Sequence, residues 1–364
     1  MKMSDVLIIN CPNYTQENVD KAIATIFKDI KIEIKSHSKV LIKPNILMAK
    51  KPEYACTTNP AMIEAVCKVL SKSHCEIIIG ESSGWNTMHG FEVSGIKAVA
   101  EKYHARIIVF ENDKIVDKKI DGVVLKELKI TSLVDNVNYI INMPKMKTHA
   151  FMKITGAVKN CFGFIPGFQK ALYHTKGKDE KTFGELLIDI YLRCKDKIVI
   201  NIMDAIVGME GEGPGNGDPK NTGLVIASTD AIALDVIQSR IMGFDPLKIQ
   251  TINSAIKRKL IDIADIKVIG DYKNSNVPRL TYKSPGAGKG ITKFITTAKS
   301  YLTKTPVLIP EVNKEKCIKC GICAKLCPVQ CITLKPYPTF DRKICIKCYC
   351  CHEHCPQGAI FLKR

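Results

Sequence analysis

The chain has no apolar run near the length of a membrane span. Of its 364 residues 46% are hydrophobic, yet no run approaches the roughly 20 residues that a transmembrane helix needs. The first ten residues contain neither a long apolar segment nor a small-residue cleavage site, so we expect no signal peptide. Together these absences predict a cytoplasmic protein.

Arginine is scarce although the chain is strongly basic. The formal net charge is +18, but only 7 of the 54 basic residues are arginine. Nucleic-acid-binding surfaces use arginine for forked contacts to bases and phosphates, whereas here lysines are spread along the whole chain. We therefore interpret the charge as a solvated, lysine-rich surface and expect no nucleic-acid partner.

The length predicts more than one domain. Residues 1–272 alternate short apolar runs with amphipathic segments, which predicts a large α/β domain with a mixed or parallel sheet. Strands are expected at 6–9, 40–42, 76–79, 106–110, 139–142, 198–203, 224–227 and 266–269, and helices at 18–28, 95–103, 183–194 and 230–242. A polar, Gly- and Pro-rich texture then begins, and we assign residues 273–310 to a linker and 311–364 to a second, smaller domain.

Cysteine is distributed unevenly. Six of the 16 cysteines are scattered over the first 194 residues, and ten lie between Cys317 and Cys355. Scattered cysteines in a reducing compartment are usually small buried hydrophobic residues, whereas ten within about 39 residues indicate ligands. The run Cys317-Ile318-Lys319-Cys320 recurs as Cys345-Ile346-Lys347-Cys348, and both copies continue to Cys-Pro, so a small metal module is duplicated.

Each copy reads C-x2-C-x2-C-x3-C-P, which resembles the bacterial ferredoxins that hold two [4Fe–4S] clusters. The resemblance covers residues 311–364 and implies a small α+β domain in which the fourth cysteine of each run binds the other cluster. The implied ligand sets are Cys317, Cys320, Cys323 and Cys355 for one cluster, and Cys345, Cys348, Cys351 and Cys327 for the other. Zinc sites typically use paired C-x2-C knuckles, so we favour iron–sulfur chemistry and one-electron transfer.

Four further residues lie close to these ligands. Cys331 and Cys350 are surplus, and we interpret them as small packed side chains, with a spare ligand or a redox-sensitive thiol as the alternative. His352 and His354 flank the second run and are interpreted as solvated surface, with tuning of the cluster potential as the alternative. Residues 311–364 carry ten basic and four acidic residues, an excess that offsets the negative charge of thiolate-bound clusters.

In the large domain, residues 140–163 contain the strongest candidate site. Lys145, Lys147 and His149 alternate at period two, so they project from one face of an extended strand. Lys159 and Asn160 lie near the first turn of a helix expected to begin at 155–156. Basic side chains beside a helix N-terminus predict an anion site; the alternative is a solvated basic strand edge.

A second candidate is the glycine-rich stretch 208–217, which follows a predicted strand ending at Asp204. Loops at the carboxyl ends of parallel strands commonly bind ligands, and Asp204 and Glu210 are candidate acids or metal ligands. No G-x-G-x-x-G joins strand to helix here, so a dinucleotide site is not indicated. The loop at 80–84 contains two serines but lacks the strand–elbow–helix context of a nucleophile.

From these patterns we predict Lys145, His149 and Lys159 as catalytic residues. We predict Lys147, Asn160 and Glu210 as residues that bind a cofactor or substrate. At least three of the four basic residues are expected to line one cleft together with the 208–217 stretch.

Several segments resemble the family labelled domain of unknown function 362, whose members often carry a C-terminal two-cluster ferredoxin module. These segments are residues 43–45, 57–62, 80–84, 143–160 and 203–214. The resemblance covers about residues 5–270 and implies no assigned activity. The arrangement of His149, Lys159 and His174 is also similar to that of the lactate-racemase family, which would make Lys159 the anchor of a nickel-pincer nucleotide, His174 a metal ligand and His149 an acid/base.

The leading hypothesis is an electron-transfer protein whose ferredoxin domain relays electrons to or from an anion-binding site in the large domain. The expected cofactors are two [4Fe–4S] clusters, and the expected partners are a redox protein (ferredoxin-like or a reductase) and a small anionic substrate. If the protein is an enzyme, it is an iron–sulfur oxidoreductase. One alternative makes the large domain a non-catalytic docking module, and another makes it a nickel-dependent isomerase, in which the clusters would have no purpose.

Overall fold

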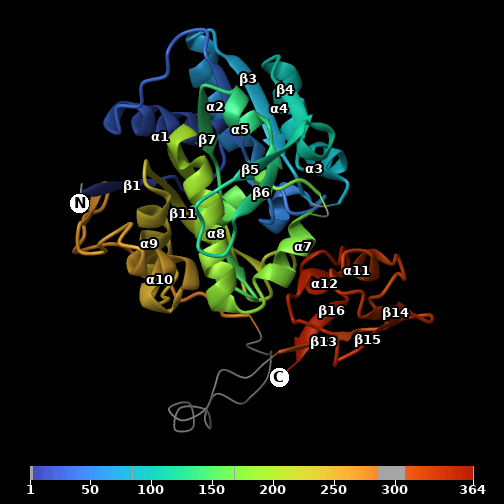
Figure 1. Cartoon of the computed structure of the whole chain (residues 1–364). Coiled ribbons are helices and arrows are strands. Elements are labelled where there is room, and N and C mark those ends of the chain that lie inside the picture. Colours follow the sequence, from blue (N-terminus) through green and yellow to red (C-terminus); the bar gives the residue numbers. More distant parts are fainter. Residues whose placement is uncertain (1–2, 84, 168, 286–307, 364) are drawn as a thin grey trace.

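The computed structural model describes residues 3–83, 85–167, 169–285 and 308–363. Figure 1 shows a large α/β body and a small C-terminal module packed beside its lower end. This architecture confirms the expected fold class, a large α/β domain with a mixed sheet followed by a small α+β domain. Residues 286–307 of the predicted linker lie outside the described residues.

The large body contains the following elements. Its strands are β1 (Ser4–Asn10), β2 (Lys39–Lys43), β3 (Glu76–Glu81), β4 (Arg106–Val109), β5 (Ile115–Lys119), β6 (Glu127–Thr131), β7 (Tyr139–Asn142), β8 (Lys145–His149), β9 (Lys153–Thr155), β10 (Ile198–Glu210), β11 (Asp218–Ser228) and β12 (Ile266–Gly270). Its α-helices are α1 (Gln16–Asp29), α2 (Pro60–Lys72), α3 (Thr87–Val93), α4 (Ile96–Lys102), α5 (Leu133–Asn136), α6 (Ala157–Asn160), α7 (Gln169–Lys176), α8 (Glu180–Cys194), α9 (Ala231–Ile241) and α10 (Gln250–Lys257).

Ten of these strands form one mixed sheet in the order β12-β1-β11-β10-β7-β2-β3-β4, with β8 and β9 attached through β10. The half β10-β7-β2-β3-β4 is parallel, and β11 runs antiparallel to both of its neighbours. Strands β7, β2 and β3 are adjacent and parallel, so their carboxyl ends lie side by side at one edge. In open α/β sheets that edge is the usual place for a ligand.

Alternation of apolar residues along the central strands creates two separate cores. Leu41 faces one core, and its neighbours Val40 and Ile42 face the other. Helices α8, α9 and α10 cover the first face, and α1, α2 and α4 cover the second (Figure 1). Because both faces are buried, the strands read as nearly continuous apolar runs, as expected of a sheet covered by helices on both sides.

Strand β10 is longer than the sequence predicted. The expected strand at 198–203 continues through Asp204 to Glu210, because β11 pairs with β10 from Asn201 to Glu210. Glu210 is therefore a strand residue, and the true loop is only 211–217. Apolar periodicity could not show this, since the extension is specified by the neighbouring strand rather than by local sequence.

The small module repeats one backbone pattern twice. Its elements are β13 (Ile309–Val312), α11 (Ile322–Lys325), β14 (Ile332–Leu334), β15 (Pro338–Phe340), α12 (Cys350–Glu353) and β16 (Ile360–Lys363), with β13 paired to β16 and β14 to β15. Lys319 and Lys347 occupy equivalent positions and both have φ of 58°. Gly321 and Tyr349, with φ of 77° and 61°, likewise precede α11 and α12. The sequence repeat is thus also a structural repeat.

Candidate functional site

The cysteines of the module surround two cavities, each of which matches one predicted ligand set. About 380 Å³ of space is lined by Cys317, Cys320, Cys323 and Cys355 among other residues. About 320 Å³ is lined by Cys345, Cys348, Cys351 and Cys327, together with the surplus Cys331 and Cys350. Among the described residues, no three His, Cys, Asp or Glu side chains are grouped closely enough to hold a single metal ion. Thiols spread around a cavity suit a cubic cluster better than one ion.

The glycine-rich loop, predicted to bind a ligand, forms contacts with the C-terminal module. Asn216 Nδ2 donates to the carbonyl oxygens of His352 (3.3 Å) and Cys355 (3.5 Å). Lys50 Nζ in turn donates to the carbonyl oxygen of Gly215 at 2.6 Å. A Cβ atom on Gly215 would lie 2.7 Å from the carbonyl oxygen of Glu353, so only glycine allows this close approach. Gly215 therefore serves the contact between the two domains.

Strand β8 carries its two lysines into the interior, where each has protein partners. Lys145 Nζ donates to Asp204 Oδ2 at 2.7 Å and to the Tyr14 hydroxyl at 2.8 Å. Lys147 Nζ donates to Asn45 Oδ1 at 2.7 Å and to the carbonyl oxygen of Cys56 at 2.8 Å. Burial lowers the pKa of both amines, that of Lys147 to about 8. Both amines therefore already have hydrogen-bond partners inside the large body.

His149 lies at the contact between the domains. Its Nδ1 accepts hydrogen bonds from the backbone amides of Phe151 (3.0 Å) and Met152 (3.2 Å). Burial lowers the pKa of His149 well below its ordinary value, so the ring is neutral and its proton is on Nε2. That nitrogen is 3.1 Å from Glu353 Oε1 of the module. His149 therefore presents a single N–H to the module carboxylate.

The N-terminus of α6 is not an open anion site. The backbone amides of Ala157 and Val158 donate to the two carboxylate oxygens of Asp235, at 2.6 and 3.1 Å. An internal carboxylate thus occupies the position that we predicted for a bound anion. The prediction failed because Asp235 lies on α9, far from α6 in sequence, and only the packing of the two helices brings it there.

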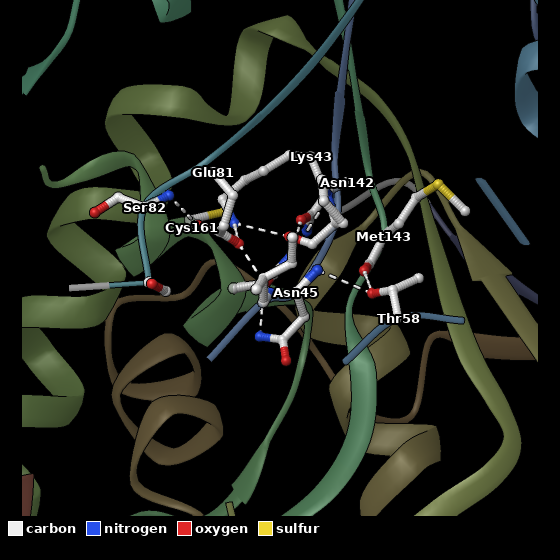
Figure 2. Close-up of polar contacts among 12 residues, drawn as sticks. Lys43, Asn45, Thr58, Glu81, Ser82, Asn142, Met143 and Cys161 are labelled. Carbon is white, nitrogen blue, oxygen red and sulfur yellow. Dashed lines mark hydrogen bonds and ion pairs between the residues drawn. The ribbon is translucent and has the colours of Figure 1, made fainter. Parts of the chain in front are cut away.

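The carboxyl ends of β7, β2 and β3 lie side by side in the sheet, and residues from these three segments meet there. Figure 2 shows Lys43 at the end of β2, Asn45 just after this strand, Glu81 at the end of β3 and Asn142 at the end of β7. Lys43 Nζ pairs with Glu81 Oε2 at 2.7 Å, and both side chains are buried. Asn45 Nδ2 donates to Asn160 Oδ1 at 3.0 Å, while Asn160 Nδ2 donates to Asn142 Oδ1 at 2.7 Å. These bonds lock the strand ends to α6.

A cleft opens between this network and the module. It encloses about 710 Å³ that no protein atom fills, part of it continuous with solvent. Its polar walls from the large body are Asn45, Glu81, Ser82, Ser83, Lys159, Asn160, Lys170 and His174, and those from the module are Cys350, Glu353 and His354. Cys350 also lines the second cysteine cavity. One wall of the cleft is therefore shared with the predicted position of a cluster.

Three polar groups on the cleft walls form no hydrogen bond among the described residues: the Lys159 amine, His174 Nδ1 and Glu353 Oε1. The His174 ring stacks on Phe183 at 4.4 Å between centroids, and burial lowers its pKa to about 3, so it is neutral. Buried polar groups are normally satisfied. Their presence in an open cleft indicates space for a ligand.

Comparison with known proteins supports the division into two parts. Residues 40–240 match the family described as Domain of unknown function (DUF362), and this match spans more than half of the chain. The chain belongs to the DUF362 family. Residues 310–333 match the 4Fe-4S binding domain, so this DUF362 protein also carries an iron–sulfur domain. That match includes the first cysteine run, and the second run lies beyond it.

Two individual proteins are similar to this DUF362 chain. The thylakoid-associated protein sll1697 of Synechocystis sp. is 32% identical over 220 residues, which cover 60% of this chain and 67% of that protein. The lactate racemase apoprotein of Thermoanaerobacterium thermosaccharolyticum aligns over 64% of this chain and 55% of its own, at 12% identity and a TM-score of 0.41. A likeness at that level carries no functional argument. In the described part of the chain, no helix is long and apolar enough to cross a membrane.

The predicted site residues of this family member are not gathered in one cleft. Lys159 and Asn160 line the cleft. Lys145 and Lys147 are instead hydrogen-bonded to partners inside the large body. His149 lies against Glu353 of the module. Glu210 lies elsewhere, paired with Lys220 at 3.0 Å and Lys283 at 3.1 Å. The expectation of a single cleft that includes the glycine-rich loop was therefore wrong, although the roles assigned to these residues stay predictions.

The sequence did not reveal most of the module residues that line the cleft. His352 and His354 were interpreted as solvated surface, but His352 is buried and His354 Nδ1 lies 3.1 Å from the carbonyl oxygen of Cys350 on the cleft wall. Glu353 and Lys170 were not considered. Only the contact between domains reveals them, because nothing in a cysteine-rich run distinguishes a residue that faces a second domain from one that faces water.

Proposed function

We propose that this DUF362 protein is an iron–sulfur electron-transfer protein whose module holds two [4Fe–4S] clusters and exchanges single electrons with a small anion in the cleft. The two ligand sets are Cys317, Cys320, Cys323 and Cys355, and Cys345, Cys348, Cys351 and Cys327. When bound, the clusters supply one-electron redox chemistry. The chain's own residues bind and orient the ligand and exclude water from it.

One observation carries the proposal: the cleft that contains unpartnered Lys159 and His174 shares the Cys350 wall with the second cysteine cavity. A ligand bound there would lie next to the nearer cluster. Electron transfer requires this proximity, whereas a merely structural cluster does not.

The charges around the cleft support an anionic ligand. Glu81 is neutralised by Lys43 in a buried pair. Of the other charged residues that line the cleft, Lys159 and Lys170 are basic and Glu353 is acidic. Burial lowers the pKa of Lys159, and it lowers that of Lys170 to about 8, so an anion that restores a counter-charge stabilises both ammonium groups. The proposed roles are charge neutralisation by Lys159 and hydrogen bonding by His174 Nδ1, with Asn160 holding the wall in place.

Replacement of Lys159 by Ala tests the proposal. Wild-type and variant proteins are purified anaerobically, and the small molecules released on denaturation are identified and quantified by mass spectrometry. We expect K159A to bind the released anion about tenfold or more weakly, because a charge-assisted hydrogen bond is lost. Visible spectra and iron content should not change. Lys181→Ala, an exposed lysine on α8, is the matched control.

The same preparation separates the alternatives. If no small molecule co-purifies and K159A behaves like the control, the cleft is not a ligand site and the large domain is better explained as a docking module for a redox partner. If nickel is found in the metal analysis and depends on Lys159 and His174, the isomerase hypothesis replaces electron transfer. The cytoplasmic location stays a prediction.

A further inference from the structure

The two cysteine cavities have different surroundings. The second lies toward the large body: its wall residue Cys350 also lines the cleft, and its wall residue Tyr349 makes an edge contact with Phe151 at 6.1 Å between centroids. Both cavities are lined by module residues, but Cys320 at the first is exposed, whereas the ligand cysteines at the second are buried or half-buried. An electron that enters the module from outside therefore has its most accessible entry at the first run.

The surface over the first cavity is apolar. Ile318 is 60% exposed and Leu334 is 40% exposed, and both line that cavity. Leu334 ends β14, and Figure 1 shows the β14–β15 hairpin on the side of the module that faces away from the large body. Large apolar side chains held in water beside a redox centre are typical of a contact made only when a partner is bound.

The chain around this apolar centre is rich in lysine. Between residues 313 and 340 it has five lysines and a single acidic residue, Glu315, although Lys325 lies over the Trp85 ring of the large body, 4.2 Å from its centroid. Two of the lysines, Lys314 and Lys319, lie over the ring of Tyr337 at 5.8 and 4.9 Å from its centroid. Ile318, Lys319, Cys320, Leu334 and Tyr337 together are called the outer patch. An apolar centre with a charged rim of one sign is the usual anatomy of a transient protein interface.

We propose that the outer patch docks an acidic one-electron carrier protein, which supplies or removes the electrons used at the cleft. This inference rests on the proposed function. In the reductive direction the carrier's centre loses one electron and the first cluster gains it; the electron then passes to the second cluster and to the ligand. No covalent bond forms or breaks in the docking step. A nucleic-acid occupant is disfavoured because Arg342 and Arg364 are the only arginines in residues 311–364.

The duplicated sequence supplies a matched pair of variants. Lys319 and Lys347 are both exposed, both have φ of 58°, and each precedes a cluster cysteine. Asn tolerates this left-handed backbone, so Lys319→Asn and Lys347→Asn remove equal charge with equal strain. Lys347, however, lines a hollow shared with the large body. At physiological ionic strength charges act over about 8 Å, so only the lysine at the true docking surface should affect association.

The test is anaerobic stopped-flow reduction of the full-length, cluster-loaded protein by a photoreduced acidic flavodoxin. We expect K319N to lower the second-order rate constant about three- to tenfold at an ionic strength of about 0.15 M, and K347N to lower it less than about twofold. Ile318→Glu, which places a negative charge in the apolar centre, should lower it at least as much as K319N. Reduction by dithionite, which needs no docking, should be the same in K319N and K347N, and cluster potentials measured for every variant separate a changed driving force from changed docking.

Several outcomes would overturn the proposal: equal slowing by K319N and K347N, no slowing by K319N and I318E, or faster reduction by a basic carrier than by the flavodoxin. The readout is cluster reduction and not turnover at the cleft, so the two proposals fail separately. Loss of the K319N effect with an intact Lys159-dependent cleft rejects only the docking surface. An intact K319N effect without any cleft ligand rejects only the function proposed for the cleft.

Discussion

The large body and the module have different kinds of interior. The body has two apolar layers on either side of a ten-stranded sheet, and its buried charges are paired, as in Lys43–Glu81 and Lys145–Asp204. In the module, cysteines make up four of the seven buried residues of the core, namely Cys323, Cys331, Cys351 and Cys355. The body can stabilise itself by burying apolar surface, whereas a small domain with so little core needs its cofactor.

Loss of the clusters should produce the largest difference in stability between the module and the body. Holoprotein is expected to contain about eight iron and eight sulfide per chain, and chelation of the iron should unfold the module while the body keeps its own melting transition. Calorimetry and circular dichroism before and after chelation measure this. Cys320→Ser should damage mainly one cluster, and Cys331→Ala should leave the iron content unchanged. About four iron per chain in the wild type would remove one cluster and the relay with it.

Breaking a buried pair in the body should have the next largest effect. Asp204→Ala leaves the Lys145 amine buried without its carboxylate and removes the partner of the Tyr14 hydroxyl, 2.7 Å away. We expect the free energy of unfolding to fall by about 3–5 kcal/mol. Asp20→Ala breaks the pair with Lys68, which lies at the surface, and should lower it by less than about 1 kcal/mol. Equal losses in the two variants would show that burial does not decide the energy of these pairs.

The boundary between the regions stays a prediction and can be tested with fragments. Residues 1–272 should form a soluble fragment that melts cooperatively. Residues 1–285 should be more stable by about 2–4 kcal/mol, because Tyr282 is buried in the body and the amide of Leu280 donates to the carbonyl oxygen of Ile241 at 2.7 Å. Chemical denaturation compares the two. Aggregation of both fragments in the absence of the module would show that the regions share one core.

The smallest expected effect concerns pH. The pKa of His174 is about 3 in the folded protein because of burial, whereas in the unfolded chain it is near 6.5. As pH falls from about 6.5 to about 5.5, the unfolded chain takes up a proton that the folded chain does not, so the free energy of unfolding decreases by about 1 kcal/mol. His174→Phe should remove this contribution to the slope of stability against pH. An unchanged slope in H174F would mean that His174 is protonated when folded.

Much of the fold could be predicted because its signals are local. The strands at 40–42 and 76–79 and the helices at 183–194 and 230–242 appear close to their expected positions as β2, β3, α8 and α9. Each element buries at least one face, so its pattern of apolar residues is imposed along a short stretch of chain. The cysteine runs were equally clear, because cluster ligation depends on a fixed spacing of a few residues.

The candidate site could be predicted only in part. Lys145, Lys147 and Lys159 look alike in the sequence, yet the first two are satisfied by Asp204, Asn45 and the carbonyl of Cys56, and only Lys159 reaches the cleft without a partner. Those partners come from distant segments. Free and occupied lysines therefore become distinguishable only when the sheet is assembled.

By itself the sequence determined the α/β pattern and the duplicated cysteine module, and it predicts the cluster ligands, since each follows from residues close together in the chain. Tertiary structure alone decided three contacts. Asp235 accepts a hydrogen bond from the N-terminus of α6, Gly215 packs against the module, and Glu353 lies beside His149. Each of these is a contact between groups far apart in the chain. Such contacts depend on how the body and the module pack, and no local pattern encodes that packing.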